Sequence, residues 1–267
     1  MPGNDHSGLI VQPRDRRFFE ELGIMRVIDR EQAKIVAGFG STTRVNARLL
    51  ALTRAGLLRR SFLGTGTGTS GGSRKALYAL SEKSARLVGV PHRGPRRKLD
   101  ETLVADFFVE HQMAVNEIYC ALKYREMPQE GIAFRRWIAF YEPVSQGVRL
   151  VPDGYVELVT KSGVLAAFLE VDLGHERGPV WKEKVKNYLQ LALSNDFERR
   201  FGQSRFRVLV LVTSDRRMHS LRKIVAATTQ KIFWFASLAT VRDKGILAPV
   251  WFRPIGEEPR PFIDERS

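Results

Sequence analysis

The sequence predicts an α/β protein of two domains, and three observations support that prediction. The chain has 267 residues, more than one small domain usually contains, and 43% of them are hydrophobic, which is enough for two cores. Apolar residues recur at helical spacing through residues 14–56, as is typical of a small helical domain. Residues 151–173 instead alternate between apolar and polar side chains, which predicts two strands joined by a turn at residues 161–163.

Three helices are predicted in order at the start of the chain. The first covers residues 14–24. Asp29 and Ser41 are suitable N-caps for the second and third helices, because their side-chain oxygens can accept a backbone N–H, and Gly56 ends the third helix. Two strands follow, LRRSFL and RKALYAL, on either side of a Gly- and Thr-rich tip, and Ser81 caps a fourth helix. This order predicts a winged helix-turn-helix.

Positive charge is concentrated in the same part of the chain. Residues 1–100 hold 19 Lys and Arg against 8 Asp and Glu, so they carry +11 of the net charge of +14. Such a one-sided excess favours a polyanionic partner, and nucleic acid fits better than a membrane because no basic amphipathic anchor helix is present. Arg and Asn at the front of the third helix suit base edges, and the basic residues of the wing and linker suit phosphates. The expected DNA contacts are Thr42, Thr43, Arg44, Asn46, Arg48, Arg59, Arg60, Arg74, Lys75, Arg96, Arg97 and Lys98.

A linker is predicted at residues 91–100, where PHRGPRRKLD combines two prolines, a glycine and four basic residues. It separates a domain at residues 1–90 from a second one at residues 101–267. In the second domain we expect a long helix from Glu101 to about Arg125, a strand at RRWIAFYE, the hairpin, a helix at VWKEKVKNYLQLAL and a buried strand at FRVLVLVT. A further helix and the strands IFWFASL and APVWFRP are expected after it. The predicted order is αβββαβ, with a mixed sheet.

The alternation gathers three carboxylates on one face of the hairpin. Glu170 and Asp172 share a face of the second strand. If the hairpin folds about Ser162, Asp153 lies opposite Glu170 or Asp172, depending on where the turn is centred. Like charges at this spacing need a cation, and Mg²⁺ prefers such oxygen ligands. A solvated sheet face that carries scattered acids is the alternative interpretation.

Two lysines follow on the next helix. Lys182 and Lys184 lie near the edges of an apolar stripe formed by Trp181, Val185 and Tyr188. Either amine can therefore reach back over the predicted sheet.

These residues resemble a known nuclease motif. Pro152-Asp153, then Glu170-Val171-Asp172, then a helical lysine before a tyrosine are similar to the PD-(D/E)xK nuclease superfamily. More narrowly, the chain resembles the replication-relaxation family of plasmids and integrative elements, which joins an N-terminal winged helix to a restriction-endonuclease-like domain. The matching segments are RRFFEELGIMRVIDREQ, YALSEKSARLVGV, HQMAVNEIYCAL and the VPD/LEVD/KVKNYL core.

The resemblance implies a Mg²⁺ or Mn²⁺ site at Asp153, Glu170 and Asp172, with Lys184 as the catalytic lysine and Glu117 of the long helix as an additional ligand. The sequence departs from the superfamily at Asp172, which stands where the usual lysine follows the glutamate by two residues. The resemblance further implies duplex DNA as the partner, together with replication or conjugation proteins.

Two functions remain open at this point. One is a Mg²⁺-dependent endonuclease or nickase that acts on duplex DNA at sites chosen by the winged helix. The other is a non-catalytic DNA-binding regulator or relaxosome accessory protein with a degenerate nuclease fold.

The composition excludes several other classes of protein. The single cysteine, Cys120, cannot form a disulfide framework, and five dispersed histidines give no zinc-binding spacing. The N-terminal residues are polar, and the longest apolar run has only the length of a strand. We therefore expect a cytoplasmic protein without a membrane span.

Overall fold

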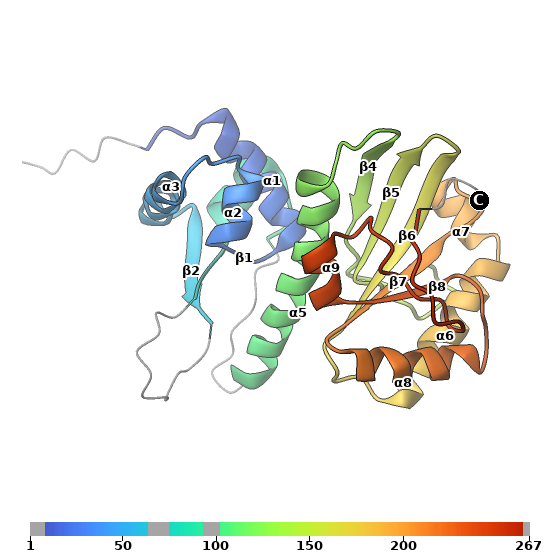
Figure 1. Ribbon diagram of the computed structural model, residues 1–267. Coiled ribbons are helices and arrows are strands. Elements are labelled where there is room, and N and C mark those ends of the chain that lie inside the picture. The colour runs from blue at the N-terminus through green and yellow to red at the C-terminus, as the bar shows by residue number, and fades with distance from the viewer. Residues whose placement is uncertain (1–8, 64–74, 93–101, 264–267) are drawn as a thin grey trace, which may run out of the picture. The chain divides into compact units, whose positions relative to one another are not determined.

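The computed structural model describes residues 9–63, 75–92 and 102–263. The predicted wing tip and most of the predicted linker lie outside these ranges, as do the expected DNA contacts Arg74, Arg96, Arg97 and Lys98. The chain forms two compact units, Met1–Cys120 and Ala121–Ser267 (Figure 1).

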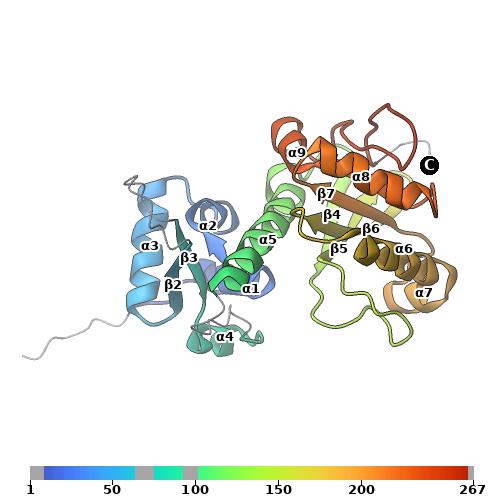
Figure 2. The ribbon, with the colours of Figure 1, turned by 90° about the horizontal axis from the view of Figure 1, so that it is seen from below.

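The first unit combines helices with a small antiparallel sheet (Figures 1 and 2). The strands are ordered β1-β3-β2, and the two-residue strand β1 was not predicted. The elements are α1 (Pro13–Met25), β1 (Ile28–Asp29), α2 (Arg30–Val36), α3 (Thr42–Arg54), β2 (Leu58–Phe62), β3 (Ala76–Leu80), α4 (Glu82–Val88) and α5 (Thr102–Cys120).

The helix starts in this unit follow the predicted caps. The Asp29 carboxylate accepts the backbone N–H of Gln32 at 2.8 Å, and the Ser41 hydroxyl accepts that of Arg44 at 3.3 Å. Ser81 caps α4 in the same way. Each cap satisfies a backbone donor that the helix itself leaves without a partner. The predicted starts of these three helices are confirmed.

Helix α5 packs with the first unit. The Asn116 amide donates to the backbone oxygens of Met25 at 3.1 Å and Val27 at 2.6 Å, and the Gln32 amide donates to the backbone oxygen of Met113 at 3.1 Å. The two Asn116 bonds satisfy buried backbone acceptors where α1 ends and β1 is about to begin. The compact first unit therefore extends well beyond the predicted range of residues 1–90.

The second unit is built on a mixed five-stranded sheet, ordered β4-β5-β6-β7-β8. Strands β4, β5 and β6 are antiparallel, whereas β7 and β8 run parallel to β6. The predicted mixed sheet is confirmed. The elements are the π-helical turn η1 (Ala121–Arg125), β4 (Ile132–Ile138), β5 (Gly154–Thr160), β6 (Gly163–Asp172), α6 (Gly178–Leu193), α7 (Asp196–Phe201), β7 (Arg207–Val212), α8 (Asp215–Ala226), β8 (Phe233–Ser237) and α9 (Leu238–Lys244).

Three details of the prediction for this unit were wrong. Strand β4 begins at Ile132 and ends at Ile138, earlier than the predicted RRWIAFYE segment. The short helices α7 and α9 were not predicted, because neither is long enough to show a clear apolar period. Within the described residues, APVWFRP forms only isolated bridges, one of which joins Phe252 to Phe235.

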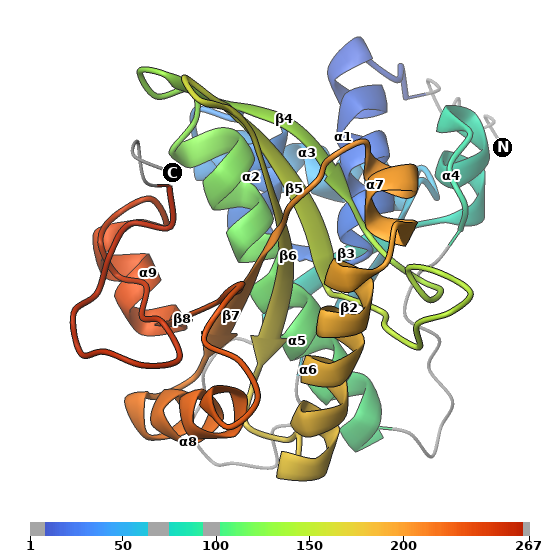
Figure 3. The ribbon, with the colours of Figure 1, turned by 90° about the vertical axis from the view of Figure 1, so that its right-hand side faces the viewer.

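One face of the sheet carries the main core, and helices α6, α7 and α8 cover it (Figure 3). An aromatic cluster fills the space between the sheet and α7. Phe168 lies 5.2 Å from Tyr155 and 5.7 Å from Phe201, measured between ring centroids. Since the carboxylates of the hairpin lie on this same face, they are covered by helices rather than solvated. No helix among the described residues combines the length and the apolar character needed to cross a membrane.

Gly154 provides a test of the packing at the start of β5. A Cβ atom at this position would overlap the indole ring of Trp137. We expect Gly154→Ala to lower the free energy of unfolding by about 1–3 kcal/mol, because an overpacked site must displace its neighbours. Urea denaturation measures the change. Gly147→Ala is the matched control, since its Cβ would meet only an ordinary contact at 3.7 Å from Asp196. Equal losses in both variants would contradict the assigned packing.

Candidate functional site

The register of the hairpin settles which carboxylates face each other. Gly154 pairs with Leu169, so Asp153 lies opposite Glu170 rather than Asp172. The Asp153 carboxylate also accepts the backbone N–H of Val171 at 2.7 Å, which fixes it across strand β6. The predicted convergence on one sheet face is confirmed, because Asp172 follows Glu170 by two residues on the same strand.

Glu170 is the central group of this carboxylate cluster, which we define as Asp153, Glu170 and Asp172. Its side chain is only 1% exposed. One carboxylate oxygen accepts from the Lys184 amine at 2.8 Å, and the other accepts from the Tyr188 hydroxyl at 2.6 Å. Lys184 and Tyr188 are four residues apart on α6 and therefore share a helix face. Lys184, not the exposed Lys182, is the lysine that reaches back over the sheet.

Asp172 is held by a different set of partners. Its Oδ2 accepts from the Trp181 indole N–H at 2.5 Å and from the Arg217 Nη2 at 2.7 Å. Its Oδ1 accepts from the Arg217 Nε at 3.1 Å and from the backbone N–H of Gly174 at 2.6 Å. Both oxygens are thus occupied, and a bidentate arginine balances the charge.

The electrostatics of the cluster follow from burial and from these ion pairs. Burial raises the pKa of Glu170 to about 7, against the opposing effect of Lys184 and with a further increase from Asp153. Burial lowers the pKa of Lys184, but Glu170, Glu176 and Asp153 together raise it well above its ordinary value. Lys184 therefore stays protonated. Its charge is shared between Glu170 and Glu176, and the Glu176 carboxylate lies 2.7 Å from the Lys184 amine.

Sequence reasoning missed two charged residues of this site. Glu176 lies in the loop between β6 and α6, and Arg217 lies in the first turn of α8. A signal for Arg217 was available, because α8 follows strand β7, and the carboxyl ends of parallel strands meet at one edge of a sheet. Glu157, on the same sheet face, is fully buried and is balanced by Arg136 at 2.5 Å. The sequence analysis did not include Glu157 among the candidate site residues.

The residues fit a divalent ion in part. Mg²⁺ commonly uses one or two protein carboxylates together with water and phosphate oxygens, and Asp153 and Glu170 face each other as such a pair. Asp172 does not fit as a ligand, because both of its oxygens already accept two hydrogen bonds. Within the described residues, no group of three or more His, Cys, Asp or Glu side chains is arranged to hold a metal ion. Glu117, which the resemblance implied as an additional ligand, lies on α5 in the first unit.

Most of the expected DNA-contacting residues that the structure describes in the first unit are exposed. Thr43, Arg44 and Asn46 are exposed on the first turns of α3, and Thr42 is half-buried. Arg59 and Arg60 are exposed on β2.

Arg48 is an exception, and its expected outward position is wrong. Its Nε donates to the Asp15 carboxylate at 2.9 Å, and its Nη2 donates to the backbone oxygen of Ile10 at 2.8 Å. The Asp15 side chain is 3% exposed, so this ion pair joins α3 to α1 inside the unit. The hydrogen bonds that Arg48 donates to Asp15 raise the pKa of Arg48.

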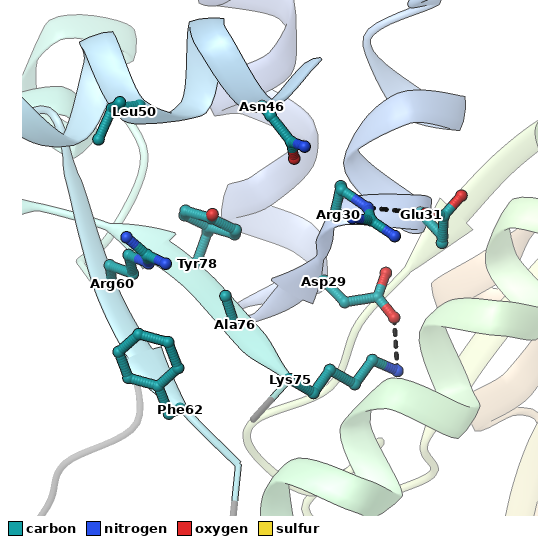
Figure 4. A pocket seen from close by; sticks show the side chains of 10 residues that line it. All are labelled: Asp29, Arg30, Glu31, Asn46, Leu50, Arg60, Phe62, Lys75, Ala76 and Tyr78. Carbon is teal, nitrogen blue, oxygen red and sulfur yellow. Dashed lines mark hydrogen bonds and ion pairs between the residues drawn. The ribbon is translucent and has the colours of Figure 1, made fainter. Parts of the chain in front are cut away.

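A cavity of about 560 Å³ is lined by residues of α3, β2 and β3. Figure 4 shows Asn46 and Leu50 of α3 above Arg60 and Phe62 of β2. The guanidinium of Arg60 lies 4.8 Å from the centre of the Phe62 ring. Lys75 lines the cavity too, where its amine pairs with Asp29 at 2.6 Å, although half of the lysine side chain remains exposed.

Comparison with known proteins gives one match. A family model described as Replication-relaxation matches residues 19–204, which include α3, the hairpin and α6. Searches of curated proteins and of solved structures found no protein similar to this chain.

Replacing Lys184 tests the buried ion pair. We expect Lys184→Met to lower the free energy of unfolding at pH 8 by about 3 kcal/mol, because it leaves a buried carboxylate without its cation. A carboxyl whose folded pKa lies above its unfolded value loses stability as the pH rises between the two values. Lys184→Met removes the cation and so raises the folded pKa of Glu170 further. The variant should therefore lose more free energy of unfolding at pH 8 than at pH 5, where the Glu170 carboxyl is mostly protonated.

Urea denaturation at both pH values measures this difference. The exposed Lys182→Met is the matched control and should change stability little at either pH. A loss for Lys184→Met that is equal at pH 5 and pH 8 would contradict the assignment.

Proposed function

Because the chain belongs to the replication-relaxation family, which indicates a role in the replication of plasmids or mobile elements, we propose that it is a duplex-DNA-binding protein. In this proposal the first unit is a winged helix, α3 is its recognition helix, and β2 and β3 form its wing. Arg44 and Asn46 contact base edges, while Arg59 and Arg60 contact phosphates.

The exposed polar and basic residues of α3 and β2 carry the proposal. Arg44 and Asn46 lie in the first two turns of α3, the part of a recognition helix that contacts base edges in the major groove. Arginine suits guanine and asparagine suits adenine, since each can make two hydrogen bonds to one base. No ion pair to Arg44 or Arg59 occurs among the described residues, so their charge is available to DNA.

Substitutions on α3 test this assignment. We expect Arg44→Ala and Asn46→Ala each to weaken binding to a preferred duplex by about 1–3 kcal/mol and to reduce discrimination against other sequences. Binding should also weaken steeply between low and physiological salt, because bound counterions are released from the DNA. A duplex selected from a random library, followed by fluorescence anisotropy with that duplex and with a scrambled one, measures both effects.

Two variants of α3 serve as comparisons. Arg54→Ala removes an exposed arginine from the last turn of the same helix and should leave discrimination unchanged. Arg48→Ala should instead lower stability, because it leaves the buried Asp15 without a cation. If Arg44→Ala weakened selected and scrambled DNA equally, base reading by Arg44 would be excluded.

The second unit supports a further candidate function, divalent-ion-dependent cleavage of DNA. The order of elements is in accord with a restriction-endonuclease-like domain. Three antiparallel strands are followed by a helix and then by strands that join the same sheet in parallel. The specific observation is the facing pair of Asp153 and Glu170 with the Lys184 amine beside it.

The charges at this site suit that chemistry. The carboxylates of the cluster and of Glu176 outnumber the two cations Lys184 and Arg217. A divalent ion held by Asp153 and Glu170 would polarise a phosphate and activate a water molecule. Lys184 would stabilise negative charge that develops on the phosphate, and Asp172 would position Trp181 and Arg217 rather than bind the ion.

Metal-dependent nicking tests the second candidate. We expect Mg²⁺ or Mn²⁺ to raise the melting temperature of the wild type, since a ligand of the folded state stabilises it, and to permit nicking of a supercoiled plasmid. Asp153→Asn and Glu170→Gln should lose both effects while they retain duplex binding. Lys184→Ala should lose nicking, and Lys182→Ala should keep it. A wild type that shows neither stabilisation nor nicking with either ion would leave DNA binding as the function and exclude cleavage.

A further inference from the structure

A second cavity, of about 400 Å³, lies in the second unit where strands β6, β7 and β8 begin. Its lining includes Val164 of β6, Arg207 of β7 and Trp234 of β8. The carboxylate cluster lies instead near the end of β6, so the two sites are at opposite ends of this strand. At about 3.3 Å per residue, the four positions from Ala166, which lines the cavity, to Glu170 of the cluster separate the two sites by roughly 13 Å.

Three arginines line this cavity. Arg205, Arg207 and Arg253 come from the start of β7 and from the segment after α9. The guanidinium of Arg207 lies 5.0 Å from the centre of the Trp234 ring, and that of Arg253 lies 4.6 Å from it. None of the described residues that line the cavity is acidic.

The arginines repel one another. Burial lowers the pKa of Arg253, and the nearby charges of Arg207 and Arg260 lower it further. Arg253 donates to the backbone oxygen of Gln230 at 2.8 Å, which orients the guanidinium but supplies no negative charge. Like charges in a partly buried position are unfavourable, and an anion between them would remove that repulsion.

The indole N–H of Trp234 is an independent second observation. The Trp234 side chain is buried, with 8% of the residue exposed, and its Nε1 atom has no hydrogen-bond acceptor among the described residues. A buried donor without an acceptor costs about 1–3 kcal/mol. The Trp234 ring thus lies close to two cations, while its indole N–H has no acceptor among the described residues. Both features point to a missing acceptor that carries negative charge.

We propose that this cavity binds a phosphate group, presented by a free nucleotide or by a nucleic-acid strand. Guanidinium groups match phosphate oxygens with paired hydrogen bonds. The apolar walls, which include Phe206 and Ile232, offer surface for a sugar and a base. The volume is within the range of sites for small ligands. This site lies outside both the proposed DNA contacts of the first unit and the carboxylate cluster.

Calorimetric titration of the full chain tests the proposal. The probes are inorganic phosphate, thymidine monophosphate, thymidine, a six-nucleotide thymidylate strand and a hexaglutamate peptide, all in EDTA so that no divalent ion contributes. We expect the phosphate-bearing probes to bind and thymidine to fail. A strand that binds at least tenfold more tightly than the mononucleotide, with a difference that Arg205→Gln removes, identifies a nucleic-acid source, and equal affinities identify a free nucleotide.

Two variants locate the binding. Arg205→Gln removes an exposed arginine and should not disturb folding, whereas Arg253→Gln removes a half-buried one. Each should weaken binding of the phosphate probes on the order of tenfold. Arg199→Gln, which removes an exposed arginine of α7 with the same change of charge, should leave it unchanged. Thermal unfolding of each variant checks that it is folded.

Three outcomes would overturn the proposal. The first is that no phosphate-bearing probe binds the wild type. The second is that Arg205→Gln binds these probes as tightly as Arg199→Gln. The third is that hexaglutamate binds while phosphates do not, which would assign the cavity to an acidic peptide. A loss of binding in Arg205→Gln cannot come from the proposed DNA contacts of the first unit, because this variant leaves α3 and β2 intact.

Discussion

The ion pair between Glu170 and Lys184 is the interaction on which the arrangement of the second unit depends. Burying a carboxylate away from water is unfavourable unless charge and hydrogen bonds replace the lost hydration. Here the Lys184 amine supplies the charge and the Tyr188 hydroxyl supplies a second hydrogen bond. Both donors belong to one face of α6, so the pair fixes the rotation of that helix over the sheet. The same rotation brings Trp181 to Asp172.

Charge is distributed unequally along strand β6. Near its end lie the carboxylates, of which Glu170 pairs with Lys184 and Asp172 pairs with Arg217. At its start lie arginines without an acidic residue among the described lining of their cavity. A single strand thus separates a region suited to cations from one suited to anions.

In the first unit, internal ion pairs reduce the positive charge that is available to a partner. Arg48 neutralises the buried Asp15, and Lys75 pairs with Asp29, the residue that caps α2. These bonds join α3 to α1 and β3 to α2, so they serve the fold. The arginines that remain exposed on α3 and β2 form a smaller set than the count of basic residues implies. The net charge therefore indicates the sign of a partner's charge, but it does not identify the residues that contact the partner.

The sequence by itself determined the local structure and the faces of its elements. Caps at Asp29 and Ser41 set the helix starts, and the two-residue period of the second hairpin strand put Glu170 and Asp172 on one side, because the pleat of a strand permits no other arrangement. Only the tertiary structure decided the partners of those residues. Arg217 is 45 positions from Asp172, and Arg48 is 33 positions from Asp15. Such pairs depend on how separate elements pack, and no local period or spacing in the sequence encodes that packing.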